Sequence, residues 1–247
     1  MHRVGILGAT GMVGQRFTLL LENHPWFQVT CLAASPKSAG KTYREAVEGR
    51  WAFKQTPIPA YIADLTVQDA SHIDEIAPLV DFVFCAVDMP KAEIRALEEA
   101  YAKAELPVVS NNSAHRMTAD VPMMIPEVNP EHTDIIAYQR KRLGTRRGFI
   151  VVKPNCSIQT YVPALHPLMD FEPDQVVACT YQAISGAGKT FDRWPEMIDN
   201  VIPYIGGEEQ KSEQEPLKIW GKIDGSEIKL TASPLITSQC IRVPVTD

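Results

Sequence analysis

A glycine triplet between a buried strand and an amphipathic helix constrains the fold more than any other feature of this sequence. Gly8, Gly11 and Gly14 directly follow the apolar segment 3–7 and open the segment 12–22, whose apolar residues recur at helical spacing. In this context Gly8 permits a tight turn, Gly11 lets the backbone approach a pyrophosphate, and Gly14 lets helix and strand pack closely. The run predicts a Rossmann-type domain whose cofactor contacts are Gly8, Thr10, Gly11, Met12, Val13 and Gly14.

Extended short-chain dehydrogenases and epimerases carry a similar glycine run, but their chemistry needs a tyrosine followed four residues later by lysine. None of the 7 tyrosines in this chain has lysine at that position. The sequence therefore disfavours that class.

Strand-like and helical segments alternate through the first half of the chain, the pattern of a parallel α/β sheet. The expected strands are 3–7, 27–34, 81–87, 107–110 and 148–153, with helices at 12–22 and 91–103. After Cys156 the pattern is less regular: a helix over 157–169, a strand over 175–184, a polar helix over 208–220, and strands over 227–232 and 240–245 that look antiparallel. We expect two domains, a cofactor domain at 1–150 and an α+β domain at 151–247.

The end of the second strand indicates which dinucleotide is bound. An NAD site places Asp or Glu there to hold the ribose hydroxyls. This chain instead has Ser35, Lys37 and Ser38 within the run 34–41, which contains no acid. Hydroxyl and ammonium groups suit the 2′-phosphate of NADP, so NADP is favoured, and an ordinary polar loop with surface lysines is the alternative.

Composition excludes several classes of protein. The 24 Lys and Arg against 30 Asp and Glu give a net charge of −6, which argues against nucleic-acid binding. No apolar run reaches the roughly 18 to 20 residues needed to cross a membrane, and no leader pattern is visible. The 5 cysteines form no C-x-x-C pair and the 6 histidines show no ligand spacing, so neither disulfides nor a metal is expected. A cytoplasmic protein follows.

Cys156 is the candidate nucleophile. Cys31, Cys85, Cys179 and Cys240 lie in apolar strand-like runs, where cysteine behaves as a small hydrophobe. Cys156 instead follows Asn155 at a strand end and precedes a helix, where the dipole favours a thiolate. The turn's N–H groups, with the Asn155 amide, would serve a tetrahedral oxyanion. The alternative is a buried turn cysteine.

With these features the chain resembles the aspartate-β-semialdehyde dehydrogenases, and the spelling is similar to the archaeal and fungal branch. Seven blocks occur in the family's order: 8–14, 38–41, 110–117, 154–157, Gln182 with 185–188, 208–211 and 240–243. The resemblance implies that NADPH reduces β-aspartyl phosphate to aspartate semialdehyde through a thioester, on the route to lysine, diaminopimelate, threonine and methionine. It also implies a homodimer or homotetramer.

The resemblance assigns further roles by position. Cys156 is the nucleophile and Gln182 orients the acyl group. Arg116 and Lys211 match phosphate-binding positions, Arg242 the carboxylate clamp, and Glu208, or its neighbour Glu209, the amine-binding acid. Ser185, Gly186 and Gly188 complete the cofactor contacts. For Glu208 and Lys211 the alternative is a surface ion pair on a charged helix.

Three other functions stay open. N-acetylglutamyl-phosphate reductase and malonyl-CoA reductase share the thioester chemistry, and a nucleotide-binding module without catalysis is the third. In the family the segment matching 240–247 continues with glycine and then the histidine that acts as general acid/base, whereas this sequence ends at Asp247. The resemblance therefore implies a truncated form that turns over poorly, with an exposed sheet edge and an apolar patch in its second domain.

Overall fold

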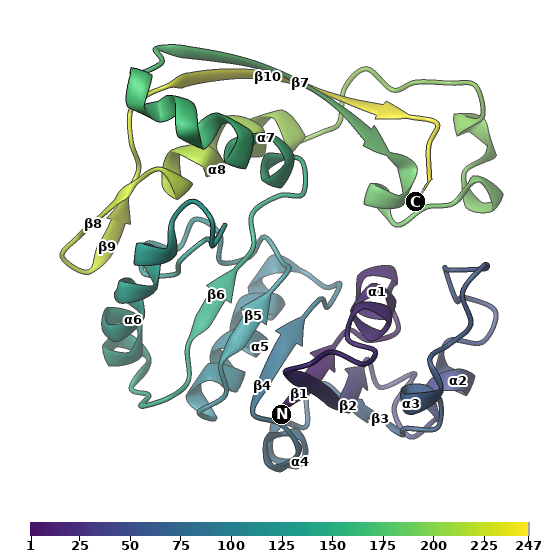
Figure 1. Ribbon diagram of the computed structural model, residues 1–247. Coiled ribbons are helices and arrows are strands. Elements are labelled where there is room, and N and C mark those ends of the chain that lie inside the picture. The colour runs from purple at the N-terminus through teal and green to yellow at the C-terminus, as the bar shows by residue number, and fades with distance from the viewer. Residues whose placement is uncertain (247) are drawn as a thin grey trace. The chain divides into compact units, whose positions relative to one another are not determined.

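The computed structural model describes residues 1–246, which form two compact units (Figure 1). The first unit contains residues 1–122 and 134–153, and the second contains 123–133 and the chain from 154 onward. The sequence analysis placed 123–133 in the first domain. The segment joins the second because the buried His132 donates from Nε2 to the carbonyl of Gly221 at 3.0 Å, while its Nδ1 lies 3.0 Å from Asn129 Nδ2.

A six-stranded sheet forms the centre of the first unit, as the alternating pattern predicts. Every pairing in it is parallel, and the strand order is β3-β2-β1-β4-β5-β6, that of a doubly wound dinucleotide-binding fold. The strands are β1 (His2–Leu7), β2 (Phe27–Ala34), β3 (Val67–Asp69), β4 (Phe82–Cys85), β5 (Val108–Ser110) and β6 (Ile150–Val152).

The core of the first unit is built on the apolar strands of this sheet. Val4, Ile6 and Leu7 of β1 have no exposed surface, and Leu32 of β2 is equally buried. The helices are α1 (Met12–Leu20), α2 (Tyr43–Ala46), α3 (Ala60–Ala63), α4 (Ile73–Ile76), α5 (Lys91–Lys103) and α6 (Ile136–Leu143), with 3₁₀ turns at Ala77–Leu79 and Pro130–Ile135. Within residues 1–246 no helix has the length and apolarity needed to cross a bilayer.

The second unit carries a smaller sheet, in which β7 (Gln175–Ala183) pairs with β10 (Leu235–Val243). The pairing is parallel, so the antiparallel arrangement expected for the last strand is wrong. A parallel pair needs a crossover, and the chain between the two strands supplies it with α8 (Glu208–Ile219), which packs on β10 (Figure 1). The unit's other elements are α7 (Ile158–Leu165), 3₁₀ turns at His166–Phe171, Ile184–Ala187, Phe191–Arg193 and Pro195–Met197, and the antiparallel hairpin β8 (Lys222–Asp224) and β9 (Glu227–Lys229).

The two faces of the β7–β10 sheet differ sharply. On the face toward α8, Ile236 and Cys240 are buried. On the other face Val177 is 85% exposed, Tyr181 71% and Leu235 63%. The expected apolar patch is therefore present.

The outer edge of β10 is not open where the structure records its N–H groups. The Ser238 N–H donates to Glu213 Oε1 at 3.1 Å and the Cys240 N–H to Glu209 Oε1 at 3.4 Å, both on α8. The Arg242 N–H donates to the Ile202 carbonyl at 2.8 Å. These acceptors correct the expectation of an exposed edge at those positions.

Candidate active site

The glycine turn between β1 and α1 has the geometry of a phosphate cradle. Gly8 has a φ of 82°, and a Cβ there would lie 2.4 Å from the Ala86 carbonyl oxygen. A Cβ on Gly14 would lie 2.2 Å from the Gly8 oxygen. Both positions therefore require glycine for internal packing.

Packing within the protein does not require glycine at position 11. It is the N-cap residue of α1, and a Cβ there would meet only the Gly8 oxygen, at the ordinary contact distance of 3.5 Å. The protein's own packing would tolerate that carbon, whereas a ligand lying against the turn would not. The N–H groups of Met12, Val13 and Gly14, in the first turn of the helix, have no carbonyl partner within it. The cradle fits a dinucleotide pyrophosphate.

The turn after β2 contains the three predicted polar residues and one contact that was not predicted. The Ser38 N–H donates to the Ser35 carbonyl at 2.9 Å, Lys37 is exposed, and Ser38 is buried. Arg50, which the sequence analysis did not select, donates from Nη2 to Ser38 Oγ at 3.0 Å. Arg50 lies 12 residues from Ser38, so no local pattern could have found it.

Cys156 lies exposed in the turn that leads into α7, one residue before the N-cap Ser157. The Asn155 side chain organises this turn, because its Oδ1 accepts from the Ser157 N–H at 3.0 Å and lies 3.6 Å from Cys156 Sγ. The thiol is therefore accessible and sits at a helix N-terminus, the placement that the sequence predicts.

The other cysteines divide into two groups. Cys31, Cys85 and Cys240 are buried, and burial raises the pKa of the Cys31 thiol to about 12 and of Cys85 and Cys240 above their ordinary value. Cys179, also expected to be buried, is exposed. It occupies an outward position of β7, on the face that α8 does not cover.

Polar side chains of the second unit converge on Asn155. Its backbone N–H donates to Glu215 Oε2 at 2.7 Å and its Nδ2 to Glu208 Oε2 at 2.8 Å. Lys211 Nζ lies 2.5 Å from Glu208 Oε1. The Asn155 amide was expected to serve an oxyanion, but here it connects the Cys156 turn to α8, because the carboxylates of the buried Glu215 and the partly buried Glu208 need donors.

The Glu208 carboxyl stays ionised in this setting. Burial raises its pKa, but hydrogen bonds and charge from Lys211, with hydrogen bonds from Asn155 and Gln182, outweigh burial and hold the pKa below its ordinary value. Its side chain is 12% exposed, so the pair with Lys211 is more than a surface contact. Glu209 faces β10, through its contact with the Cys240 N–H. The geometry thus favours Glu208 over Glu209 as the acid beside Cys156.

Gln182 and Arg242 are register partners on β7 and β10. Arg242 is buried and donates from Nη1 to the Ala183 carbonyl at 2.6 Å. A Cβ on Gly186 would lie 3.0 Å from that Nη1, so the 185–188 turn packs closely on the guanidinium. Gly188 ends the turn with a φ of 67°, and its N–H donates to the Ser185 carbonyl at 2.8 Å. The structure thus brings Cys156, Asn155, Gln182, Glu208 and Lys211 together and places Arg242 beside Gln182.

Arg116 belongs to the first unit, unlike the other predicted substrate residues. It is buried and donates from Nε to the Lys153 carbonyl at 3.0 Å. The loop that carries it is attached to α5, since Arg95 donates to the Ala114 carbonyl at 2.7 Å and Ser110 donates to the buried Glu98 at 2.5 Å. Neither Glu98 nor Glu215 was selected from the sequence, because a buried carboxylate on a polar helix looks like any solvated one.

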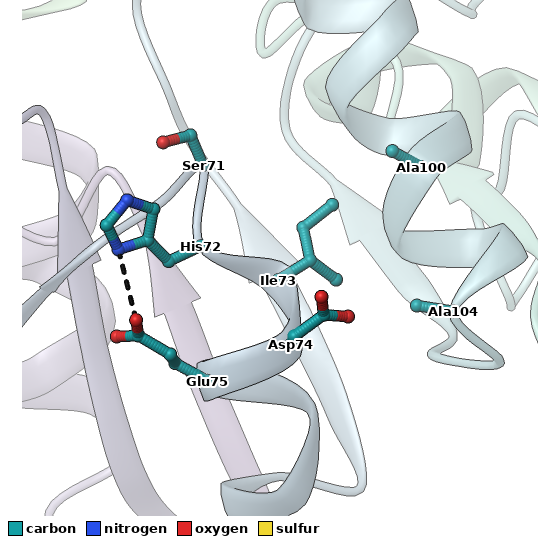
Figure 2. A pocket seen from close by; sticks show the side chains of 7 residues that line it. All are labelled: Ser71, His72, Ile73, Asp74, Glu75, Ala100 and Ala104. Atoms are coloured by element: carbon teal, nitrogen blue, oxygen red, sulfur yellow. Dashed lines mark ion pairs between the residues drawn. The ribbon is translucent and has the colours of Figure 1, made fainter.

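A surface hollow of about 430 Å³ lies elsewhere in the first unit, between the 71–75 segment and the end of α5 (Figure 2). His72 and Glu75 form an ion pair of 3.4 Å at its rim and are both largely exposed. None of the predicted site residues lines it. Its acids Asp74 and Glu75 would repel a phosphorylated ligand, so it is not a candidate site. Within residues 1–246 no group of three or more His, Cys, Asp or Glu side chains is placed to hold a metal ion.

Two family models match most of this chain. Residues 3–136 match the family model of the semialdehyde dehydrogenase NAD-binding domain, and residues 165–247 match that of the dimerisation domain. The aspartate-semialdehyde dehydrogenase of Archaeoglobus fulgidus is 44% identical over 247 residues, which cover 100% of this chain and 69% of the relative. The Saccharomyces cerevisiae enzyme of the same name is 43% identical, covering 98% of this chain and 68% of the relative.

Solved structures extend the likeness to the fold. The Candida albicans aspartate semialdehyde dehydrogenase, crystallised with NADP, superposes with a TM-score of 0.87 at 36% identity, over 100% of this chain and 69% of that one. The second Vibrio cholerae enzyme of this name, solved with ASA, gives 0.71 at 26% identity, over 99% of this chain and 71% of that one. The resemblance inferred from the sequence is confirmed. The chain belongs to the aspartate-semialdehyde dehydrogenase family.

Proposed function

We propose that this chain reduces β-aspartyl phosphate to aspartate β-semialdehyde with NADPH, within the biosynthesis of lysine, threonine and methionine in the cytoplasm. The observation that carries the proposal is an exposed Cys156 beside an ionised Glu208 and a cationic Lys211, in a chain of this family. A substrate with one ammonium and two kinds of anion needs both signs of charge around its nucleophile.

Cys156 supplies the covalent chemistry. Its thiolate attacks the acyl carbon, the carbon–oxygen bond to phosphate breaks, and inorganic phosphate leaves with that electron pair, so that the aspartyl group is held as a thioester. NADPH, when bound, supplies the two electrons that reduce the thioester. Asn155 positions the thiol, because its Oδ1 lies 3.6 Å from Sγ while its amide is fixed by Glu208.

The charged residues hold the substrate's other groups. Glu208 binds the ammonium and Arg242 the α-carboxylate, for which a guanidinium offers two parallel hydrogen bonds. Lys211 and Arg116 bind the phosphate, and Gln182, the register partner of Arg242, orients the acyl group. In the free protein Lys211 pairs with Glu208 at 2.5 Å, so each of these two charges has a partner before substrate arrives.

The two parts of the chain divide this work. Residues 1–150 bind NADP, through the glycine cradle and through Ser35, Lys37 and Ser38, and Ser185, Gly186 and Gly188 add contacts from the other part. Residues 151–247 carry catalysis and dimerisation. The exposed face of Val177, Tyr181 and Leu235 supports a homo-oligomer formed over this sheet, since monomers seldom leave such side chains together in water.

Phosphate-dependent reduction of NADP with aspartate semialdehyde tests the reaction in its reverse direction. We expect this substrate to be used in preference to the N-acetylated glutamate homologue, whose blocked amine has no need of Glu208. Preference for the acetylated compound, or for malonyl-CoA in the reductive direction, would transfer the assignment to those reductases. NADPH titrated on the same sample separates an enzyme from a nucleotide-binding module, which would bind without turnover.

A further inference from the structure

Arg50 lies against the turn that follows β2, although no local pattern connects it to that turn. Its Nη2 donates to Ser38 Oγ at 3.0 Å, and its Nε donates to the Ala46 carbonyl, at the end of α2, at 2.9 Å. Ser38 is only 4% exposed, so its hydroxyl is held in one place and fixes the side of the turn on which the guanidinium lies.

A buried amide of α1 attaches Arg50 to the glycine cradle as well. Gln15, 1% exposed, donates from Nε2 to the Thr10 carbonyl at 3.0 Å and to the Arg50 carbonyl at 3.2 Å. Its Oε1 accepts from the Ala52 N–H at 2.8 Å. One side chain therefore holds both the cradle and the segment that carries Arg50.

A second contact fixes α2 to the same cradle. Tyr43, fully buried, donates from its hydroxyl to the Ala9 carbonyl at 2.9 Å. The start of α2 is closed by a capping box between Thr42 and Glu45, so the helix that leads to Arg50 has a fixed beginning. Arg50 is thus held by three residues: Ser38 of the turn after β2, Ala46 of α2 and Gln15 of α1.

The charge of Arg50 is not neutralised by the protein. Among residues 1–246 no carboxylate lies within 4.0 Å of its guanidinium, whereas Arg3, Arg44 and Arg142 each pair with an acid. The turn itself, residues 35–40, contains no acid and adds the exposed Lys37. A fixed guanidinium, a fixed hydroxyl and a nearby ammonium make a site for a doubly charged oxyanion.

We propose that Arg50 is a specificity-determining residue that binds, together with Ser38, the 2′-phosphate of the adenine nucleotide. The inference rests on the proposed use of NADP and names the group that selects it over NAD. The Arg50 guanidinium donates from Nε to Ala46 and from Nη2 to Ser38, and its remaining N–H groups can donate to phosphate oxygens. They discriminate between NADP and NAD because only NADP carries the 2′-phosphate.

Binding of two nucleotide fragments to the intact chain tests the proposal without any turnover. Isothermal titration would compare adenosine 2′,5′-bisphosphate with adenosine 5′-monophosphate for the wild type, Arg50→Gln and Arg44→Gln. Arg44 lies on α2 and is largely exposed, so its replacement removes the same charge from the same region. We expect Arg50→Gln to weaken binding of the bisphosphate at least tenfold and binding of the monophosphate less than twofold. Arg44→Gln should change the affinity for neither fragment by more than twofold.

The proposal would be overturned if Arg50→Gln lost affinity equally for both nucleotide fragments, or lost affinity for neither. An equal selective loss in Arg44→Gln would also overturn it, since general charge would then suffice. If Arg50→Gln does not fold, Arg50→Lys keeps the charge but not the planar guanidinium with its several N–H donors. We then expect a selective loss of at least threefold in affinity for the bisphosphate. A wild type that does not prefer the bisphosphate contradicts the use of NADP itself, whereas a wild-type preference that survives both substitutions contradicts only the role of Arg50.

Discussion

The cofactor cradle of the first unit and the cysteine site of the second are held in place by different means. The cradle is backbone, and it follows the end of β1, whose Val4, Ile6 and Leu7 are fully buried in the six-stranded sheet. The cysteine site is made of side chains that hold one another between the Cys156 turn and α8. Added bulk should therefore damage the cradle, and changed charge should damage the cysteine site.

Of all the substitutions, Cys156→Ala should have the largest effect, and that effect should be confined to the second unit. We expect complete loss of thioester formation, because no other side chain can take the nucleophile's place, while the Kd for NADPH stays within twofold. Intact-mass measurement after incubation with substrate would detect the acyl group.

Cys179→Ala is the matched control, since it removes the other exposed thiol. A brief treatment of the wild type with a thiol reagent should label Cys156 ahead of Cys179. Loss of acylation in Cys179→Ala, or first labelling of Cys179, would contradict the assignment.

Gly14→Ala and Gly11→Ala form a pair that separates stability from binding in the first unit. The Gly14 Cβ would lie 2.2 Å from the Gly8 oxygen, so the backbone must shift, and overpacking of this kind costs about 1 to 3 kcal/mol. The Gly11 Cβ meets only an ordinary contact at 3.5 Å. We expect Gly14→Ala to lower the free energy of unfolding, and Gly11→Ala to leave it nearly unchanged while weakening NADPH.

Urea unfolding and NADPH titration on both variants decide this. If Gly11→Ala binds NADPH as well as the wild type does, no ligand lies against that turn, and the cradle is only a packing feature.

Glu215→Gln tests the charged network of the second unit. The carboxylate accepts from the Asn155 N–H at 2.7 Å, and hydrogen bonds to charged groups contribute roughly 1.5 to 3 kcal/mol. We expect a loss of about 1 kcal/mol, since the amide oxygen still accepts, and a several-fold change in the labelling rate of Cys156 with Cys179 unaffected.

Glu209→Gln is the control on the same helix, because its contact with the Cys240 N–H, at 3.4 Å, lies on β10 rather than on the turn. Equal changes at Cys156 in both variants would mean that the charge of α8, and not the contact with Asn155, sets the thiol's reactivity.

The smallest effect is expected for Glu105, whose carboxylate accepts hydrogen bonds from the backbone of the first unit. It accepts from the N–H groups of Arg146, Arg147 and Gly148, and these hydrogen bonds lower its pKa to about 2. The unfolded chain, with a glutamate pKa near 4.3, binds the proton first as pH falls. The stabilisation is therefore complete above about pH 5 and is lost as the pH falls toward 2.

Glu105→Gln should lower the Tm by a few degrees at pH 7, and the difference from the wild type should shrink as the pH falls toward 2. Glu48→Gln, at an exposed carboxylate, controls for net charge. A Tm difference that stays constant from pH 7 to pH 3 would show that the carboxylate's ionisation is not what stabilises this turn.

Local signals predicted what local forces determine. The bounds of β2 and α5 match the expected 27–34 and 91–103, since apolar runs, Pro90 and charge patterning act over a few residues. The turn at Cys156 and the glycine turn between β1 and α1 were predicted from the sequence for the same reason.

Long-range pairings could not be read in the same way. The sequence gives no sign that β10 pairs in parallel with β7, that 123–133 joins the second unit, or that Arg50 reaches Ser38. Each depends on contacts between residues 12 or more positions apart, and a strand's apolar pattern is the same whichever direction its neighbour runs.

The carboxylates of Glu209 and Glu213, on the outer edge of β10, affect how the backbone amide hydrogens of that strand exchange with solvent. A backbone N–H bonded to another strand is released only when that strand moves, whereas one bonded to a side chain is released by a torsional rotation of that side chain. Deuterium should therefore enter Ser238 and Cys240 through brief rotamer excursions of α8, while the β7 side of the same strand stays protected until the unit opens as a whole. One strand would then report two opening free energies, one for each edge.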